Sequence, residues 1–287
     1  MFAFVNVFKP VGLTSVQIGA RLRRIYGGRE RLAVGHFGTL DPAAAGVLPI
    51  ALGKATRLLP MIEDRRKSYA FTVIFGRSTT SADATGETLR TASISVDLAQ
   101  RLPEIIPRFC GIIDQFPPMY SAVHHHGRRL YELARRGESV ERKSRRATIF
   151  SLRLLGLEGA VARMRVVCSE GTYVRTLCED LGEALGLPAH MGALVREAAG
   201  PFVLEESRVL AEIEDDPAAA LIPPEHVLSF PEVVLDARGA ADFRSGRNVV
   251  LPDVSTASPI FVRDSTRSLL GVGEMRGADL TPRRVFV

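Results

Sequence analysis

The sequence predicts an α+β protein that ends in a small β-rich domain. Strand-like and helix-like runs both occur up to residue 230, so one larger domain of mixed structure is expected there. After Phe230-Pro231 the pattern changes to short strands with frequent Gly and Pro. We therefore expect two domains, residues 1–230 and residues 231–287.

The N-terminal third predicts three strands and one helix. Residues 2–8 are apolar and read as a strand, and Thr14 or Ser15 can cap the helix that follows and ends at Gly27-Gly28. Residues 43–59 are apolar but broken by Gly and Pro, which predicts a packed strand and turn rather than one helix. Residues 69–75 have strong strand propensity.

The middle of the chain predicts further strands and helices separated by loops. We expect a loop at 76–88, a helix at 96–109 interrupted by Pro103, an extended connection at 115–121, a short helix at 130–136, strands at 147–155 and 163–168, and a helix from Thr172 to Leu185. A helix-like stretch and a Pro-rich acidic connection then lead to residue 231.

Composition excludes several classes of protein. The chain has 287 residues, 46% of them hydrophobic, which is enough for a large core plus a small second domain. It contains no uninterrupted apolar run of membrane-spanning length, and no basic leader precedes the first strand. Three widely spaced cysteines predict buried free thiols in a reducing cytoplasm, not disulfides or zinc. No metal or nucleotide-cofactor motif is present, so no cofactor is expected.

Positive charge gathers in residues 124–153. This segment has nine basic and three acidic residues, whereas the whole chain has a net charge of only +5. Such an excess suits a surface that follows nucleic-acid phosphates, because each neutralised phosphate releases counterions. A solvated surface hairpin or helix without a ligand is the alternative.

A carboxylate in a Gly-flanked turn is the most informative local feature. In Gly35-His36-Phe37-Gly38-Thr39-Leu40-Asp41-Pro42, such a turn can hold a reactive oxygen open to a substrate. By itself, Asp before Pro also suits an ordinary turn. Four further blocks accompany it in order: residues 9–15 (KPVGLTS), 80–86 (TSADATG), 117–122 (PPMYSA) and 171–175 (GTYVR).

Together with Tyr69, these blocks resemble the motifs of the TruB-type family, the bacterial tRNA pseudouridine-55 synthases. The resemblance implies a core with a mixed, mainly antiparallel sheet flanked by helices, and a PUA-like β-barrel at the C-terminus. It also implies an isomerase that flips one uridine out of the T-arm loop of tRNA and needs no cofactor. The basic segment resembles the family's RNA-clamping hairpin.

The resemblance implies three catalytic residues. Asp41 would be the nucleophile, since an ionised carboxylate can join the substrate and later leave. Whether it attacks C1′ or C6, or instead removes a sugar proton, stays open. Arg175 would keep Asp41 ionised, although from the helix pattern alone it could pair with Glu179. Tyr69 would stack on the base and accept the C5 proton late in the reaction; a plain core tyrosine is the alternative.

The resemblance also implies a set of substrate-binding residues. His36 would fill the gap left by the flipped nucleotide and Tyr173 would line the pocket. The remaining candidates are Lys9, Asp83, Arg196, Arg142, Arg145 and Arg146.

The sequence departs from the family pattern in two places. The stretch 194–202 keeps only Arg196 of three family arginines, and His124-His125-His126 stands where a lysine and small residues are more common. Both changes put RNA affinity in doubt without touching the chemistry. We expect a cytoplasmic monomer without an obligate protein partner. The competing hypotheses are an RNA-folding helper with secondary catalysis and a synthase that acts on another RNA.

Overall fold

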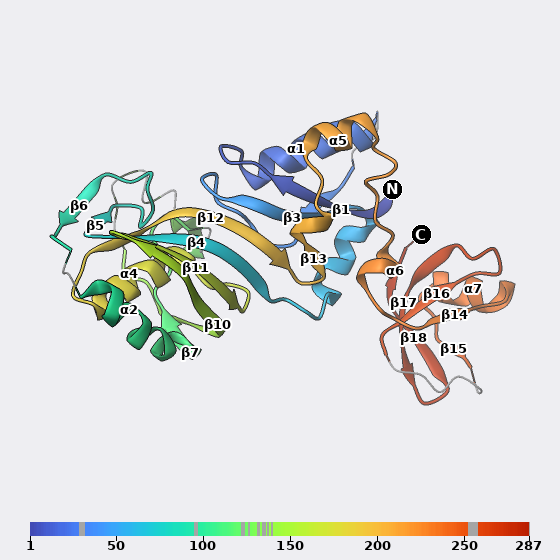
Figure 1. The fold of residues 1–287 in the computed structure, drawn as a ribbon. Helices are drawn as coiled ribbons and strands as arrows, with labels where there is room; N and C mark the ends of the chain where they lie inside the picture. Colours follow the sequence, from blue (N-terminus) through green and yellow to red (C-terminus); the bar gives the residue numbers. More distant parts are fainter. Residues whose placement is uncertain are drawn as a thin grey trace.

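Two sheets form the framework of the protein in the computed structural model (Figure 1). The structure describes residues 1–28, 32–94, 97–121, 124–125, 127–130, 133, 136, 138, 140–251 and 258–286. A nine-stranded sheet lies in the larger part, and a five-stranded sheet lies in the C-terminal part. The two chain ends lie close together between these parts, where the Phe2 and Phe286 ring centroids are 4.8 Å apart.

The large sheet is mixed and mainly antiparallel. Its main path runs β1-β3-β12-β4-β11-β10-β7, with β2 beside β3 and β13 beside β12. The strands are β1 (Phe2–Lys9), β2 (Val34–His36), β3 (Ala45–Gly53), β4 (Lys67–Phe75), β7 (Gly111–Gln115), β10 (Arg145–Glu158), β11 (Val161–Cys168), β12 (Ala189–Ala199) and β13 (Phe202–Val203). Among the described residues, all its pairs are antiparallel except β3 with β12. The predicted α+β class with this kind of sheet is confirmed.

Alternation along β4 explains why this strand is central. Every second residue from Lys67 to Phe75 is buried, and the residues between them are half-buried. The period of two points Lys67, Tyr69 and Phe71 to one face, where Phe71 joins the main apolar core. A lysine and a tyrosine therefore share the core-facing side of a strand.

The helices pack against the sheet. They are α1 (Ser15–Gly27), α2 (Leu98–Ile105), α4 (Val174–Ala184), α5 (Leu210–Asp215) and α6 (Pro224–Val227), with 3₁₀ turns at Lys54–Met61, Ile106–Phe109 and Leu204–Glu206. Of these, α4 lies against the central strands β12 and β4. Thr14 caps α1 in a reciprocal pair with Gln17, as its position predicts. Helix α4 begins after Tyr173, while the predicted cap Thr172 donates instead to the Ser169 carbonyl (2.9 Å).

Three local predictions need correction. Residues 76–88 are not a simple loop, because β5 (Arg77–Thr79) pairs with β6 (Thr88–Thr91) around a tight turn. Residues 189–199, for which no strand was predicted, form the central strand β12. Cys110 is exposed, whereas Cys168 and Cys178 are buried as expected. The predicted helix at 130–136 falls largely outside the described residues.

The C-terminal part is a small β half-barrel with one helix. Its sheet order is β14-β16-β17-β18-β15. The elements are β14 (Glu232–Val234), α7 (Ala237–Arg244), β15 (Val249–Val250), β16 (Ile260–Arg263), β17 (Leu269–Arg276) and β18 (Asp279–Val285). An apolar cluster that includes Phe4, Phe202 and Phe261 joins this sheet to the large one. The fold is consistent with the expected PUA-like domain.

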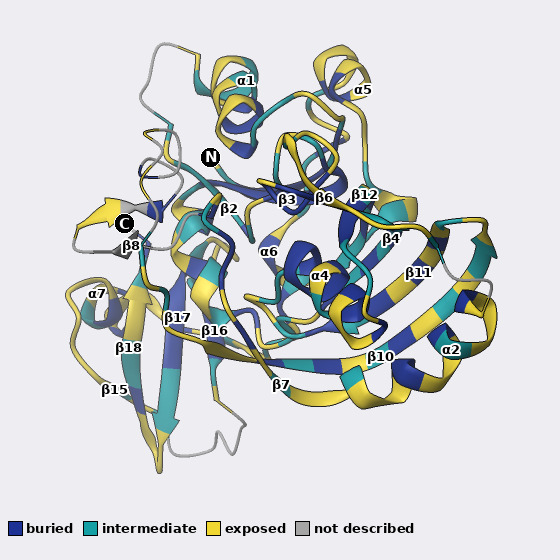
Figure 2. Cartoon of the chain, turned by 90° about the vertical axis from the view of Figure 1, so that its left-hand side faces the viewer, coloured by how far each residue is buried: buried dark blue, intermediate teal, exposed yellow. Residues whose placement is uncertain are grey.

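Exposure follows the two faces of the large sheet, as Figure 2 shows. On β10 and β11, buried residues alternate with exposed ones such as Arg153, Arg163 and Arg165. No helix among the described residues is long and apolar enough to cross a membrane.

Candidate active site

The Asp41 turn, residues 37–44 between β2 and β3, is held by hydrogen bonds to its backbone. Ser15 Oγ donates to the Leu40 carbonyl (3.0 Å) and accepts from the Leu40 amide (2.9 Å). The Gly12 amide donates to the Pro42 carbonyl (2.8 Å). Gly38 has φ +96°, a conformation that glycine adopts without strain. The turn is therefore fixed from outside and leaves the Asp41 carboxylate free to face the cavity.

Arg175 of helix α4 pairs with Asp41. The distance from Arg175 Nη2 to Asp41 Oδ2 is 2.8 Å, and the two side chains are 7% and 38% exposed respectively. The guanidinium also donates to the Tyr120 carbonyl (2.9 Å) and the Ser81 carbonyl (3.4 Å). The carbonyls of Ser81 and Tyr120 thus orient the guanidinium toward the Asp41 carboxylate. In the structure Arg175 pairs with Asp41 and not with Glu179.

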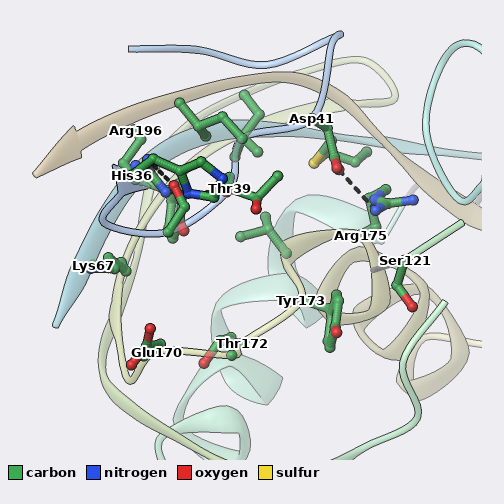
Figure 3. Close-up of a pocket in the computed structure, with 17 residues that line it drawn as sticks. His36, Thr39, Asp41, Lys67, Ser121, Glu170, Thr172, Tyr173, Arg175 and Arg196 are labelled. Atoms are coloured by element: carbon green, nitrogen blue, oxygen red, sulfur yellow. Dashed lines mark hydrogen bonds and ion pairs between the residues drawn. The ribbon is translucent and has the colours of Figure 1, made fainter. Parts of the chain in front are cut away.

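A cavity of about 460 Å³ opens beside this pair (Figure 3). Its volume is in the usual range of small-molecule sites and is wide enough for a nucleoside. It is lined by His36, Gly38, Thr39, Leu40, Asp41, Lys67, Tyr69, Ser121, Glu170, Gly171, Thr172, Tyr173, Val174, Arg175, Met191, Leu194 and Arg196. The structure therefore brings Asp41 and His36, Tyr69, and Tyr173 and Arg175 together from three separate segments of the chain.

Two tyrosines contribute aromatic surface to the cavity. Tyr69 is 8% exposed, and burial raises its pKa although the nearby Arg196 charge opposes this. Burial likewise raises the pKa of Tyr173. The Gln115 side chain holds Tyr173 in place, because it donates to the Tyr173 carbonyl (3.2 Å) and accepts from its amide (3.0 Å). Both phenols are therefore neutral near pH 7.

His36 stands on β2 at the cavity wall. Burial lowers the pKa of its imidazole, and the Arg196 charge acts in the same direction. The ring is therefore neutral near pH 7, and its Nδ1 atom is buried without a hydrogen-bond partner. A neutral ring can stack on a base without the cost of desolvating a charge.

Lys9 and Arg196 stabilise the Asp41 turn through hydrogen bonds to its backbone. Lys9 is fully buried, and its ammonium donates to the carbonyls of Pro10 (2.8 Å), Leu13 (2.7 Å) and, at 3.5 Å, Pro42. This differs from the predicted substrate-binding role, because every contact of the ammonium is to the chain itself. Burial lowers the pKa of Lys9 to about 8, although Asp41 opposes this.

The guanidinium of Arg196 acts in the same way from the opposite side of the turn. It is 1% exposed and donates to the carbonyls of Val47 (2.7 Å), Gly38 (2.9 Å) and Thr39 (3.3 Å). Arg196 borders the cavity, so its predicted contact with RNA stays a prediction, while its donors hold the backbone on both sides of Asp41.

Asp83 also differs from its prediction as a substrate-binding residue. It is 6% exposed, and its Oδ1 accepts from Ser81 Oγ (2.6 Å) and from the Thr85 amide (2.9 Å) and hydroxyl (2.6 Å). Burial raises its pKa, but these hydrogen bonds outweigh burial and hold the pKa below its usual value. The carboxylate therefore shapes the loop whose Ser81 carbonyl receives Arg175.

Two of the predicted RNA-binding arginines, Arg145 and Arg146, begin β10 and Arg142 lies three residues before it; none of them lines the cavity. Arg142 is half-buried and donates to the Pro117 carbonyl (3.0 Å), whereas Arg145 and Arg146 are exposed. Arg145 pairs in register with Gln115, whose side chain holds Tyr173. The described residues of the predicted clamping segment include the first part of β10 and a short hairpin, β8 (His124–His125) with β9 (Arg128–Arg129).

Sequence reasoning missed five polar cavity residues as site candidates: Thr39, Lys67, Ser121, Glu170 and Thr172. Lys67 could have been found, because it stands two residues before Tyr69 on the same face of a strand. Glu170 gives no such signal, since only the folded chain brings it to the cavity. Among the residues described, no group of three or more His, Cys, Asp or Glu is placed to hold a metal ion.

Comparison with known proteins identifies the family of the chain. The model of the TruB family pseudouridylate synthase N-terminal domain matches residues 23–174. The model of the tRNA pseudouridylate synthase B C-terminal domain matches residues 175–223, and that of the pseudouridine synthase II TruB C-terminal domain matches residues 231–286.

Relatives and solved structures agree with these matches. A tRNA pseudouridine synthase B from Burkholderia mallei is 41% identical over 97% of this chain and 95% of its own, and one from Pseudomonas putida is 40% identical over 97% and 93%. A chain in the structure of an H/ACA RNP bound to a substrate RNA containing 2′-deoxyuridine has the same fold, with a TM-score of 0.70 at 23% identity over 100% of this chain and 85% of that one. The motif order, the cavity with its Asp41–Arg175 pair and these matches lead to one conclusion: the chain belongs to the TruB family of pseudouridylate synthases.

Proposed function

We propose that this chain converts one uridine of tRNA, uridine 55 in the T-arm loop, to pseudouridine. The observation that carries the proposal is the 2.8 Å Asp41–Arg175 pair at a cavity with two tyrosines. The family match and the names of the 40–41% identical relatives support tRNA as the substrate.

The reaction rearranges atoms within the substrate. The N1–C1′ bond of the nucleoside breaks, the base turns, a C5–C1′ bond forms, C5 loses its proton and N1 ends with one. No electron acceptor and no outside group is consumed. The protein must therefore hold the base while it is detached and must supply a nucleophile and a route for one proton.

Asp41 is the nucleophile in this proposal. Its carboxylate is 38% exposed toward the cavity, whereas its partner Arg175 is 7% exposed and held by two chain carbonyls. The cation therefore stays in place when the carboxylate forms and breaks its bond to the nucleoside. A positively charged neighbour also favours the return of the leaving carboxylate. Attack at C1′, attack at C6 and removal of a sugar proton all begin from this placement.

The aromatic side chains fit the handling of a flipped base. Tyr69 and Tyr173 can sandwich or flank the ring, since stacking on aromatic side chains is how splayed bases are bound. The raised pKa of Tyr69 keeps its phenol protonated in the free enzyme, which supports stacking as its first role. His36 as a neutral ring fits the gap that the flipped nucleotide leaves in the RNA.

In this proposal the RNA backbone runs along the basic residues at and just before the start of β10. Arg142, Arg145 and Arg146 lie next to the strand that positions Tyr173, so phosphates bound there would continue into the cavity. The C-terminal half-barrel would contact a more distant part of the tRNA. We further propose that the chain acts in the cytoplasm as a monomer, without a cofactor or an obligate protein partner.

Replacing Asp41 tests the proposal. Asp41→Asn keeps the shape of the side chain but removes its charge, so pseudouridine formation in an unmodified tRNA transcript should be abolished while RNA binding persists. The control is Asp215→Asn, since Asp215 is exposed at the end of α5. Normal turnover by Asp41→Asn would refute the nucleophile, and modification only at other positions would refute the substrate site.

A further inference from the structure

Unpartnered polar atoms gather at the cavity. Among the described residues, five buried side-chain polar atoms lack a hydrogen-bond partner, and three of them belong to cavity residues: His36 Nδ1, Lys67 Nζ and Ser121 Oγ. Buried polar groups are nearly always paired, so such a concentration indicates atoms that wait for a ligand. Of the three, the Lys67 ammonium gains most from a bound anion, because burying a charged group without a hydrogen-bond partner costs the most free energy.

Around Lys67, the acidic residues that the structure describes already have cationic partners. Its side chain is 3% exposed, and Nζ lies 3.6 Å from the centre of the Phe37 ring. The nearby carboxylate of Glu170 is paired with Arg65, and that of Asp64 is paired with Arg66.

Lys67 also touches the catalytic turn. A Cβ atom at Gly38 would lie 3.5 Å from Lys67 Cε and 3.4 Å from Arg196 Nη1, so both cations flank the backbone three residues before Asp41. Figure 3 shows Lys67 and His36 at the end of the cavity away from the Asp41–Arg175 pair. A nucleoside bound at Asp41 therefore leaves this end of the cavity open to the RNA backbone next to that nucleoside.

We propose that the Lys67 ammonium binds a non-bridging phosphate oxygen of the linkage next to the flipped nucleoside. The proposal rests on the proposed function, since it gives that cavity a second subsite. Phosphate fits because it is the anion that a polynucleotide brings with every nucleoside, and Lys binds it as a point charge. Burial and the Arg196 charge lower the pKa of Lys67 to about 7, and a bound phosphate would oppose that shift.

A double-mutant cycle, which combines a substitution in the protein with a change in the RNA, tests the contact. The stem-loops would be an unmodified T-arm and two versions in which the linkage 5′ or 3′ of the target uridine is an uncharged methylphosphonate. They would be titrated against the chain and Lys67→Met, both carrying Asp41→Asn to prevent turnover. Lys143→Met is the matched control, since Lys143 is exposed in the basic segment outside the cavity.

The expected result is coupling at one linkage. Lys67→Met should weaken binding of the native stem-loop about tenfold, and neutralising the contacted linkage should cost the wild-type side chain about the same. Together the two changes should cost no more than either alone, while Lys143→Met should add to the linkage change. Lys67→Gln repeats the cycle if methionine lowers the melting temperature.

Two outcomes would overturn the contact. Full additivity at both linkages, or unchanged affinity of Lys67→Met, would each show that Lys67 does not bind either phosphate. Failure of the proposed function is a different result, because the chain with Asp41 intact would then form no pseudouridine in the tRNA transcript.

Discussion

Arg175 offers the sharpest test of how the site works. In Arg175→Met the apolar length of the side chain is kept, but its ion pair with Asp41 (2.8 Å) and its bonds to two carbonyls are lost. The mutant should bind the tRNA stem-loop and should isomerise its uridine slowly. The physical reason is that the carboxylate then lacks both its fixed orientation and the cation that stabilises it.

The magnitude follows from the geometry. Two unit charges about 4 Å apart interact by roughly 4 kcal/mol at an effective dielectric of about 20. The Asp41 side chain is 38% exposed, so water screens the pair and about 1–2 kcal/mol is a fairer value. If this stabilisation is realised in the transition state and not in the bound ground state, its loss slows the chemical step by roughly 5- to 30-fold. The same loss should lower the melting temperature by a few degrees.

A single-turnover assay with excess enzyme isolates the chemical step from product release. The matched control is Arg165→Met, because Arg165 forms a 2.8 Å pair with Glu197 outside the cavity lining. Both mutants lose an arginine–carboxylate pair of equal length, and only Arg175→Met should lose rate. A rate for Arg175→Met within twofold of wild type, with binding intact, would refute the catalytic role of the pair.

Two further predictions concern the support of the Asp41 turn and the buried cation beside it. Gly46→Ala should destabilise the fold by about 2–5 kcal/mol in urea unfolding, because φ is +107° and its Cβ would meet the Arg196 carbonyl at 2.3 Å. Gly12→Ala, with φ +93° and open space, controls for backbone strain; equal losses in the two would contradict the clash. Burial and then Arg196 lower the pKa of Lys67 to about 7, with Glu170, Arg65 and Asp64 also facing it. Above that pH the unfolded chain binds a proton that the folded chain releases, so the free energy of unfolding rises toward the ordinary lysine pKa. Lys67→Met should reduce this rise between pH 7 and pH 9, by at most about 2–3 kcal/mol, and an unchanged rise would show that Lys67 is not the group responsible.

The elements with a strong local signal were predictable from the sequence. The cap at Thr14 and the apolar stripe that ends at Gly28 defined α1, and β-rich composition defined β4. Strand β12 was missed, because Ala189–Ala199 is rich in Ala, Leu, Met, Glu and Arg, which favour helices. Pairing with β3 and β4 on its two sides overrides that preference.

Helix α7 was missed for a different reason. Its cap is ordinary, since Asp236 Oδ1 accepts from the Gly239 amide (2.7 Å). The helix is short and contains a glycine, and it lies in a stretch whose composition indicates strands. Where the local preference for a helix is this weak, tertiary packing determines the structure, here through the burial of Phe243 in the small core.

The sequence predicted which residues gather at the site better than it predicted what each of them does there. Motif blocks placed Asp41, Tyr69 and Arg175 in one cavity, and the structure does bring them together. The same blocks could not show that Lys9 and Arg196 face inward, because a basic residue in a motif suggests substrate phosphate as readily as a backbone carbonyl. Only the burial of these side chains and the direction of their donors distinguishes the two.

That distinction explains the electrostatic design of the turn. Lys9 and Arg196 bind carbonyl oxygens, so they fix the backbone on both sides of Asp41 without neutralising its carboxylate. Carbonyls carry only partial charge, and both cations therefore still contribute positive potential to the cavity wall. A wall of that kind attracts the phosphates of an incoming RNA. Within the described part of the chain, Arg175 is the residue that forms an ion pair with the carboxylate, which is 38% exposed and so stays accessible on its remaining sides.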